Sequence, residues 1–371
     1  MTATTTTRSS WFQRFLLPGL IFKGVVIGGG YATGRELAEF FLGSGPFGGL
    51  MGILLAMLVW SAVCAVTFLF SYRFSLYNYR DFFKGLLGPG WVVFEIAYLA
   101  LLVLILAVVA AAAGTIGAEV FGLPQIVGTL FLVFAIAATA SFGNAGVEHV
   151  FKYASSFIYL TYAVFLVLAL STFGDRIAPS LALDVPTTGW VMGGLTYASY
   201  NVVGAIAVLS FVTNFTRPRD AVIAGVVAGP LAMIPAIAFF LCMVAFYPEI
   251  ANVALPSDFL LRRMEAPWLQ IVFQLMIFCA LLETGVGIIT SLNERIAGVV
   301  ETRGKRFTPP ARLGVSAAVL LVCGFVAARV GLIDLIASGY GAFGYIMLAV
   351  FVVPLLTLGV AKVLRSRADA A

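Results

Sequence analysis

The feature that most constrains this chain is the repetition of long apolar runs with few charges. Runs of about 18 residues or more, the length that an α-helix needs to cross a bilayer, recur from Phe12 to Leu364. Of the 371 residues, 61% are hydrophobic and only 11% are charged, against about 25% charged in an ordinary soluble domain. We therefore expect an all-α integral membrane protein without a large soluble domain.

The apolar runs predict ten transmembrane spans. The first run is long and lacks a small-residue cleavage site, so it is interpreted as a span and not as a removed signal peptide. A single transmembrane domain, 14–361, is expected between an N-terminal tail, 1–13, and a C-terminal tail, 362–371. The ten expected spans cover residues 14–42, 46–70, 89–118, 124–142, 148–172, 188–214, 218–247, 266–293, 310–328 and 331–361.

The distribution of basic residues predicts the orientation. If the N-terminus is cytoplasmic, 16 of the 22 Lys and Arg residues lie in inside segments and four lie outside, while Lys23 and Arg35 fall within the first span. By the positive-inside rule, this excess places both termini in the cytoplasm and the protein in the cell membrane. The net charge of +5 is thus explained without a nucleic-acid partner.

Patterns typical of enzymes and metal centres are missing from the sequence. The single histidine, His149, excludes multi-His zinc motifs, and there is no Gly-x-Ser-x-Gly elbow. The cysteines lie in apolar runs without CxxC spacing, which predicts buried thiols. We expect no enzymatic activity and no cofactor, and no metal other than sodium as a coupling ion. The four cysteines are Cys64, Cys242, Cys279 and Cys323.

Three consecutive glycines, 28–30, lie about midway through the first span. Each glycine costs about 1 kcal/mol in a helix interior, and unpaired backbone cannot face lipid, so an interruption here must line an enclosed or watery cavity. Thr33 and Glu36 have the spacing of a capping box for a new half-helix. The span is thus predicted to be two half-helices. The alternative is that these small residues serve close helix packing.

The sixth expected span repeats this pattern. Gly193 and Gly194 precede Ser199, Tyr200 and Asn201, a polar cluster at nearly the depth of the first-span glycines. Ten spans divided five and five, each half opening with an interrupted helix, match the inverted repeats of secondary transporters. The expected repeats cover 14–172 and 188–361.

One stretch carries a family resemblance: Gly24-Val-Val-Ile-Gly-Gly-Gly-Tyr-Ala-Thr-Gly-Arg-Glu-Leu-Ala-Glu-Phe-Phe41. It resembles the first-span signature of the YkvI-type membrane proteins, in which Gly-x-Gly-Phe-Ala-Thr-Gly-x-Glu precedes a Phe-Phe pair, and the Tyr-Ala-Ser-Tyr-Asn segment of span six is similar too. The resemblance implies the amino acid-polyamine-organocation superfamily and a LeuT-like fold. Tyr31, Arg35 and Lys23 depart from the family pattern.

A substrate site is expected where the two interruptions meet. Free amide groups at the first interruption, with the half-helix dipole, would suit a carboxylate, and the span-six cluster would supply rings and polar groups. This arrangement favours an amino-acid-like solute. The expected substrate-binding residues are Gly28, Gly29, Gly30, Tyr31, Ala32, Tyr197, Ser199, Tyr200 and Asn201.

A cation or proton site is expected beside it. Carbonyls released by Gly24 and Ile27 could coordinate a hard cation, and the fold analogy puts further ligands on span eight, at Glu283 and Thr284. An ionisable group at the depth of Glu283 is a functional candidate. A pair of Lys23 with Glu283 would favour proton coupling, a static ion pair is the alternative, and sodium coupling is comparably supported.

Two features are expected on the outer side. The resemblance implies an outer gate formed by Arg35 and Asp334, with local pairing of Arg35 to Glu39 as the alternative. Ser257 could cap a short amphipathic helix, 258–264, serving as a lid or as a surface helix.

The leading hypothesis is a sodium- or proton-coupled symporter of a small amino-acid-like or related organic solute. A LeuT-fold sensor that binds such a solute without efficient transport is the second hypothesis. A channel is less favoured because no selectivity-filter repeat or ring of charge is visible.

Overall fold

A computed structural model gives the fold for residues 10–141, 143–302, 304 and 306–368. Eight helical segments in this part of the chain are long and apolar enough to cross a membrane, and two shorter apolar helices, Leu17–Val26 and Gln125–Ala140, complete the ten expected spans. The eight are Arg35–Phe74, Tyr79–Phe121, Ser155–Leu181, Trp190–Asn214, Pro218–Val244, Pro267–Glu301, Pro309–Val330 and Leu332–Ser366.

The first five spans are built from α1 to α9. Short 3₁₀ turns, η1 (Leu42–Ser44) and η2 (Gly88–Gly90), precede α5 and α7, and the amphipathic α6 (Tyr79–Leu87) joins spans two and three. The fifth span extends beyond its expected limits at both ends. The helices are α1 (Trp11–Phe15), α2 (Leu17–Val26), α3 (Gly29–Thr33) and α4 (Arg35–Phe41) in span one, then α5 (Gly45–Phe74), α7 (Trp91–Phe121), α8 (Gln125–Ser141) and α9 (Gly143–Leu181).

The second five spans begin with α10 (Trp190–Asn201), which continues as the 3₁₀ helix η3 (Val202–Asn214). The turn η4 (Glu249–Asn252) and α12 (Pro256–Arg263) connect spans seven and eight. The remaining helices are α11 (Pro218–Val244), α13 (Pro267–Thr302) and α14 (Pro309–Val330), and in span ten α15 (Leu332–Asp334), α16 (Gly341–Met347) and α17 (Val360–Ala368), with π-helical stretches η5 (Leu335–Tyr340), η6 (Leu348–Val352) and η7 (Leu355–Gly359).

Proline begins four of these helices, because the first N–H groups of a helix have no partner inside it and their loss costs little. Pro218, Pro256, Pro267 and Pro309 are the first residues of α11, α12, α13 and α14. Span nine, expected from residue 310, therefore begins one residue earlier, at Pro309.

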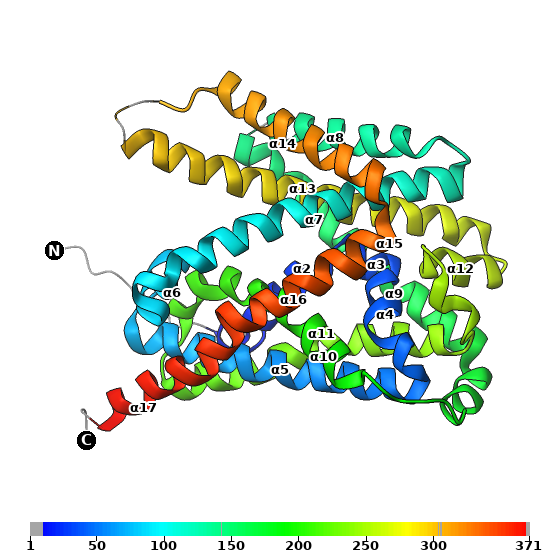
Figure 1. Cartoon of the computed structure of the whole chain (residues 1–371), viewed down its shortest axis with the longest axis horizontal. Helices are drawn as coiled ribbons and strands as arrows, with labels where there is room; N and C mark the ends of the chain where they lie inside the picture. Colours follow the sequence, from blue (N-terminus) through cyan, green and yellow to red (C-terminus); the bar gives the residue numbers. More distant parts are fainter. Residues whose placement is uncertain (1–9, 142, 303, 305, 369–371) are drawn as a thin grey trace.

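The first span passes between two groups of helices. Helices α7, α8, α13 and α14 pack together on one side of the molecule, and α5, α10 and α11 pack together on the other (Figure 1). In span one, α2 packs on α11 and η3 of the second group, whereas α3 packs on α7 and α13 of the first. The interruption between α2 and α3 thus lies where the two groups meet.

The two ends of the bundle carry different connections. Helices α6 and α17 lie at one end, and α12 lies at the opposite end (Figure 1). The α6–α17 end contains the basic residues Arg80, Lys84 and Lys362. This is the end that the positive-inside rule predicts to be cytoplasmic.

Candidate substrate and cation site

After α1, the part of span one from α2 to α4 is interrupted twice. The first interruption is at Ile27 and Gly28, where the Gly28 N–H donates to the Val26 carbonyl at 2.8 Å instead of the Gly24 carbonyl four residues back. The second is at Gly34, which has a φ of +80° and separates α3 from α4. That left-handed backbone strongly favours glycine. The expectation of two half-helices is corrected to three pieces after α1, namely α2, α3 and α4, and the middle piece, α3, has only five residues.

The expected capping box of Thr33 and Glu36 is not formed. The Thr33 hydroxyl donates to the Gly30 carbonyl at 2.8 Å and accepts from the Arg35 N–H at 3.4 Å. Glu36 is turned away from the start of its own helix and accepts a hydrogen bond from the Tyr200 hydroxyl on α10 at 2.6 Å. Glu36 therefore bonds to a residue distant in the sequence instead of to the start of its own helix.

In span six the interruption is a change of helix type. Helix α10 ends at Asn201, directly after the polar cluster, and η3 continues from Val202. Two cluster members bond to their own helix: Ser199 Oγ donates to the Leu195 carbonyl at 2.6 Å, and Asn201 Nδ2 donates to the Tyr197 carbonyl at 3.2 Å. Tyr200 is the cluster member whose side chain bridges to span one.

The two interruptions meet at what we call the junction, formed by Gly30, Glu36, Tyr197, Tyr200 and Tyr340. Glu36 is only 5% exposed. The rings of Tyr200 and Tyr340 stack with centroids 4.6 Å apart, and those of Tyr197 and Tyr200 meet edge to face at 5.8 Å. Within the described part of the chain, the buried Tyr197 hydroxyl has no hydrogen-bond partner. Such a group is explained when a water, an ion or a ligand completes it.

The other expected substrate residues surround α3. Tyr31 and Ala32 are fully buried, and the Tyr31 hydroxyl donates to the Ala232 carbonyl of α11 at 3.5 Å. Tyr31 thus bonds to the α11 side of the site. Gly28 and Gly29 stand where α3 begins, with Gly28 in extended backbone (φ −96°, ψ −169°).

The groups expected to form the cation site lie on the other side of the first interruption. A Cβ placed on Gly28 would lie 3.4 Å from Thr284 Oγ1, so the end of α2 directly adjoins α13. The Gly24 carbonyl is released from the helical pattern, as expected, and Ile27 is the C-cap of α2. Glu283 accepts from Ser155 Oγ of α9 at 2.7 Å. A carbonyl, a hydroxyl and a carboxylate supplied around α2 and α13 are ligand types that a hard cation prefers.

The expected ion pair of Lys23 with Glu283 is not formed. Lys23 Nζ lies 4.6 Å from the centroid of the Tyr159 ring, while Glu283 bonds to Ser155. Both partners belong to α9 and are four residues apart, on one face of that helix. Lys23 and Glu283 therefore each contact a different residue of α9 instead of each other.

Arg35 pairs with Glu39, which was the alternative to the expected outer gate. Its guanidinium forms an ion pair with the Glu39 carboxylate and donates to the carbonyls of Ala251 at 2.8 Å and Val253 at 3.0 Å. Asp334 is exposed, and no ion pair formed among the described residues includes it. The expected pair of Arg35 with Asp334 is thus corrected for this conformation.

Helix α12 is a packed cover and not a surface helix. Ser257 and Asp258 are buried, and a Cβ on Gly34 would lie 3.1 Å from Pro256 Cβ. The Asp258 carboxylate accepts from Arg262 Nε at 2.7 Å, Gln270 Nε2 at 2.8 Å and Gln274 Nε2 at 3.1 Å. The two glutamine bonds hold α12 against α13, directly beside the second interruption of span one.

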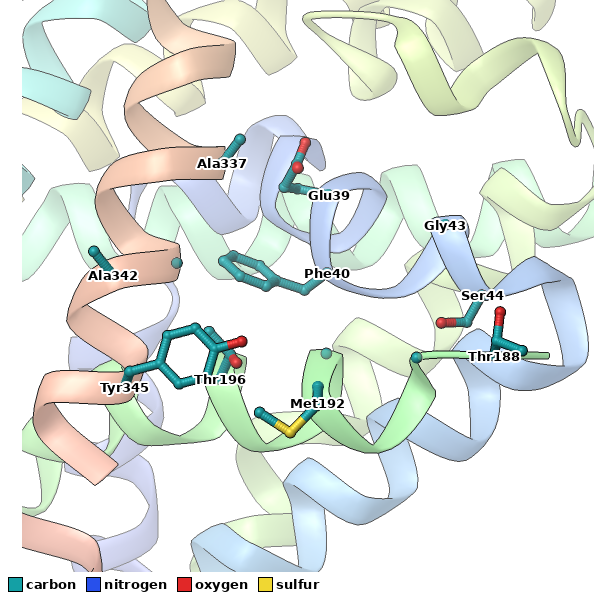
Figure 2. Close-up of a pocket in the computed structure, with 13 residues that line it drawn as sticks. Glu39, Phe40, Gly43, Ser44, Thr188, Met192, Thr196, Ala337, Ala342 and Tyr345 are labelled. Carbon is teal, nitrogen blue, oxygen red and sulfur yellow. The ribbon is translucent and has the colours of Figure 1, made fainter. Parts of the chain in front are cut away.

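A pocket of about 500 Å³ lies beside the junction, next to Phe40 (Figure 2). Its lining comes from α4 and its following turn, from the start of α10, and from span ten around α16. Phe40 lines it, and the Phe40 ring also lies 5.8 Å from the Tyr197 ring and 5.6 Å from the Tyr200 ring. The lining residues are Glu39, Phe40, Gly43, Ser44, Thr188, Gly189, Met192, Gly193, Thr196, Ala337, Gly341, Ala342 and Tyr345.

Sequence reasoning missed three residues of this region: Glu36 as a site residue, Tyr340 and Phe40. Glu36 was identifiable, because an ionisable residue inside a span is a functional candidate by default. Tyr340 and Phe40 carry no comparable signal, since aromatic residues occur throughout the spans.

Comparisons with known proteins agree with this architecture. No protein-family model matches the chain. The uncharacterized membrane protein YkvI of Bacillus subtilis (strain 168) is 22% identical over 331 residues, which cover 89% of this chain and 92% of YkvI.

Solved structures resemble the whole chain. MhsT in complex with L-phenylalanine matches with a TM-score of 0.60 at 15% identity, covering 98% of this chain and 99% of MhsT. A Na⁺-coupled sialic acid symporter matches with a TM-score of 0.59 at 13% identity, covering 95% and 82%. The H236A mutant of the Eremococcus coleocola manganese transporter matches with a TM-score of 0.60 at 13% identity, covering 96% and 81%.

These neighbours are transporters and not enzymes, in agreement with the expectation from the sequence. They share the LeuT-like fold with this chain. The chain is therefore a multi-span membrane protein of the LeuT-like fold, and its predicted resemblance to the YkvI-type membrane proteins is confirmed.

Proposed function

We propose that this protein is a secondary active transporter of a small organic solute, either amino-acid-like or a related compound. The observation that carries the proposal is the hydrogen bond of 2.6 Å between Tyr200 and Glu36. It joins the interrupted part of span one to the end of α10, and polar groups at such depth are costly unless they serve a site. The inverted repeats 14–172 and 188–361 belong to this proposal.

The neighbouring structures support a transport role. Their titles name a Na⁺-coupled symporter of sialic acid, a manganese transporter and a complex with L-phenylalanine. These cargoes differ widely, so the fold supports transport without defining the solute. Alternating access would then involve relative motion of the two helix groups that meet at span one.

We assign coupling to the region where α2 meets α13. The Gly24 and Ile27 carbonyls, Thr284 and Glu283 would form a site for sodium or carry the proton. Lys23, half-buried beside Tyr159, would tune that site through its charge. Both termini would face the cytoplasm of the cell membrane, with the basic α6–α17 end inside.

The test is solute accumulation in proteoliposomes containing the full chain. Amino acids and related amines would be offered under separately imposed sodium and pH gradients. Accumulation driven by one gradient, and lost on collapsing it with an ionophore, is the expected result. Ligand-induced thermal stabilisation without accumulation under either gradient would contradict transport and favour the sensor hypothesis.

The assigned coupling residues have their own test. Glu283→Gln should abolish gradient dependence of uptake, whereas Asp184→Asn, which removes an exposed carboxylate between α9 and α10, should not. Unchanged gradient dependence in Glu283→Gln would rule out its coupling role.

A further inference from the structure

The Glu36 side chain already occupies the position where a solute carboxylate was expected. A Cβ placed on Gly30 would overlap Glu36 Oε1 and lie 2.9 Å from its Cδ, so the carboxyl group lies directly against the backbone of α3. A second carboxylate at this position would meet both steric overlap and like-charge repulsion. The junction is thus poorly suited to a solute recognised by its carboxylate.

Glu36 lacks a cationic partner from the protein. Its neighbour Arg35 forms an ion pair with Glu39 and hydrogen bonds to the Ala251 and Val253 carbonyls. No ion pair in the described ranges includes Glu36, which receives a hydrogen bond from the neutral Tyr200 hydroxyl. A buried carboxylate without a countercharge costs free energy. A cation that binds to it removes this cost, which strengthens its binding.

Aromatic rings surround this carboxylate. Tyr197, Tyr200 and Tyr340 are buried, the Tyr200 ring contacts the rings of both other tyrosines, and Phe40 packs on Tyr197 and Tyr200 from the pocket side. Ring faces attract ammonium groups, and cages of such rings recognise organic cations. The unpartnered Tyr197 hydroxyl adds a polar group to this cage.

We propose that the solute bound at the junction is a small organic amine whose ammonium group pairs with Glu36, and that a carboxylate on the solute is not required. This inference rests on the proposed function, because it defines the solute class of the same site. The approach is from the pocket of Figure 2, through displacement of Phe40.

The experiment measures binding to the purified full chain by thermal stabilisation. The probes are the common amino acids, the amines obtained by decarboxylating them, and the acids obtained by removing the amino group. At least one amine should raise the melting temperature of the protein. The acid that lacks the amino group of the same parent amino acid should not. A carboxylate that stabilises the protein without an amino group, or a panel in which no amine stabilises it, would overturn the proposal.

Two variants sharpen this result. Glu36→Gln should weaken amine binding about 30-fold or more, whereas Asp184→Asn, which removes an exposed carboxylate, should bind as the wild type does. Unchanged amine affinity in a folded Glu36→Gln protein would also overturn the proposal. If Glu36→Gln does not fold, the amine and acid series on the wild-type protein decides the question.

The outcomes separate this inference from the proposed function. Amine binding that depends on Glu36, without accumulation in proteoliposomes under any gradient, would refute transport and leave the amine site intact. Gradient-driven accumulation of a solute that lacks an amino group would support transport and refute the amine site.

Discussion

Glycine serves opposite purposes in two regions of this molecule. Between α5 and α11 it allows close packing: a Cβ on Gly225 would lie 2.6 Å from the backbone carbon of Cys64, and one on Gly229 would lie 2.5 Å from the Met57 carbonyl oxygen. Both helices are continuous there. In span one, Gly28 and Gly34 instead mark the places where the helix stops.

The difference lies in what surrounds each glycine. Beside Gly225 the neighbours are backbone atoms of the facing helix, and beside Gly229 they are backbone atoms together with the Ser61 hydroxyl; the backbone cannot move without separating the two helices. Beside Gly30 the neighbour is the end of the Glu36 side chain, which can move. We infer that the α5–α11 interface is a rigid scaffold and that the junction is the part able to rearrange around a solute.

The largest expected effect is on the scaffold. Gly225→Val would force α5 and α11 apart, and we expect a loss of about 3 kcal/mol in the free energy of unfolding. The melting temperature of the detergent-purified protein measures this loss. An unchanged melting temperature would refute the rigid scaffold.

A glycine in open space provides the control. Gly314 lies inside α14, and a Cβ there would meet nothing within 4 Å. Gly314→Ala should be neutral or stabilising by up to about 1 kcal/mol, because alanine favours the helix.

Gly30→Ala should separate function from stability. Its Cβ displaces the Glu36 carboxylate but no backbone, so solute binding should fall about 10-fold or more while the melting temperature stays close to that of Gly314→Ala. Binding titrations and thermal melts on the same preparations give both values. Wild-type affinity in Gly30→Ala would contradict the placement of the solute at the junction.

Asp258→Asn tests the cover over the junction. The amide keeps the shape of the carboxylate but loses acceptor capacity toward Arg262, Gln270 and Gln274, which should cost about 1–3 kcal/mol. Hydrogen exchange should accelerate in α12 and not in α5. Equal protection in the variant and the wild type would show that these bonds do not hold the cover.

The smallest effect is expected at an exposed ion pair that belongs to neither region. Arg263 and Glu249 lie 2.7 Å apart, with side chains 43% and 59% exposed. Glu249→Gln should change the free energy of unfolding by no more than about 0.5 kcal/mol. A drop of several degrees in melting temperature would show that the cover depends on this pair as well.

Much of the fold could be predicted from the sequence. Hydrophobic run length predicted the ten spans, because a bilayer imposes length and backbone satisfaction on every span. The position of the first interruption followed from Gly28 to Gly30. The second, at Gly34, was missed because a single glycine in a helical pattern does not reveal its φ.

The side-chain partners could not be predicted in the same way. Lys23, Arg35, Glu36 and Glu283 were assigned partners from depth, from local spacing or from the family resemblance, and only the alternative assignment of Arg35 to Glu39 is realised. Partner choice depends on the rotation of each helix about its axis and on neighbours distant in sequence. The bond of Glu36 to Tyr200 spans 164 positions, for example.

The most direct test of the central claim is a structure of the full chain bound to the amine that stabilises it most. The account predicts ligand density at the junction, with the ammonium group within hydrogen-bonding distance of Glu36 and beside the rings of Tyr197 and Tyr200. Density confined to the pocket beside Glu39 and Tyr345, with the Glu36–Tyr200 bond unchanged and no ligand at the junction, would contradict it.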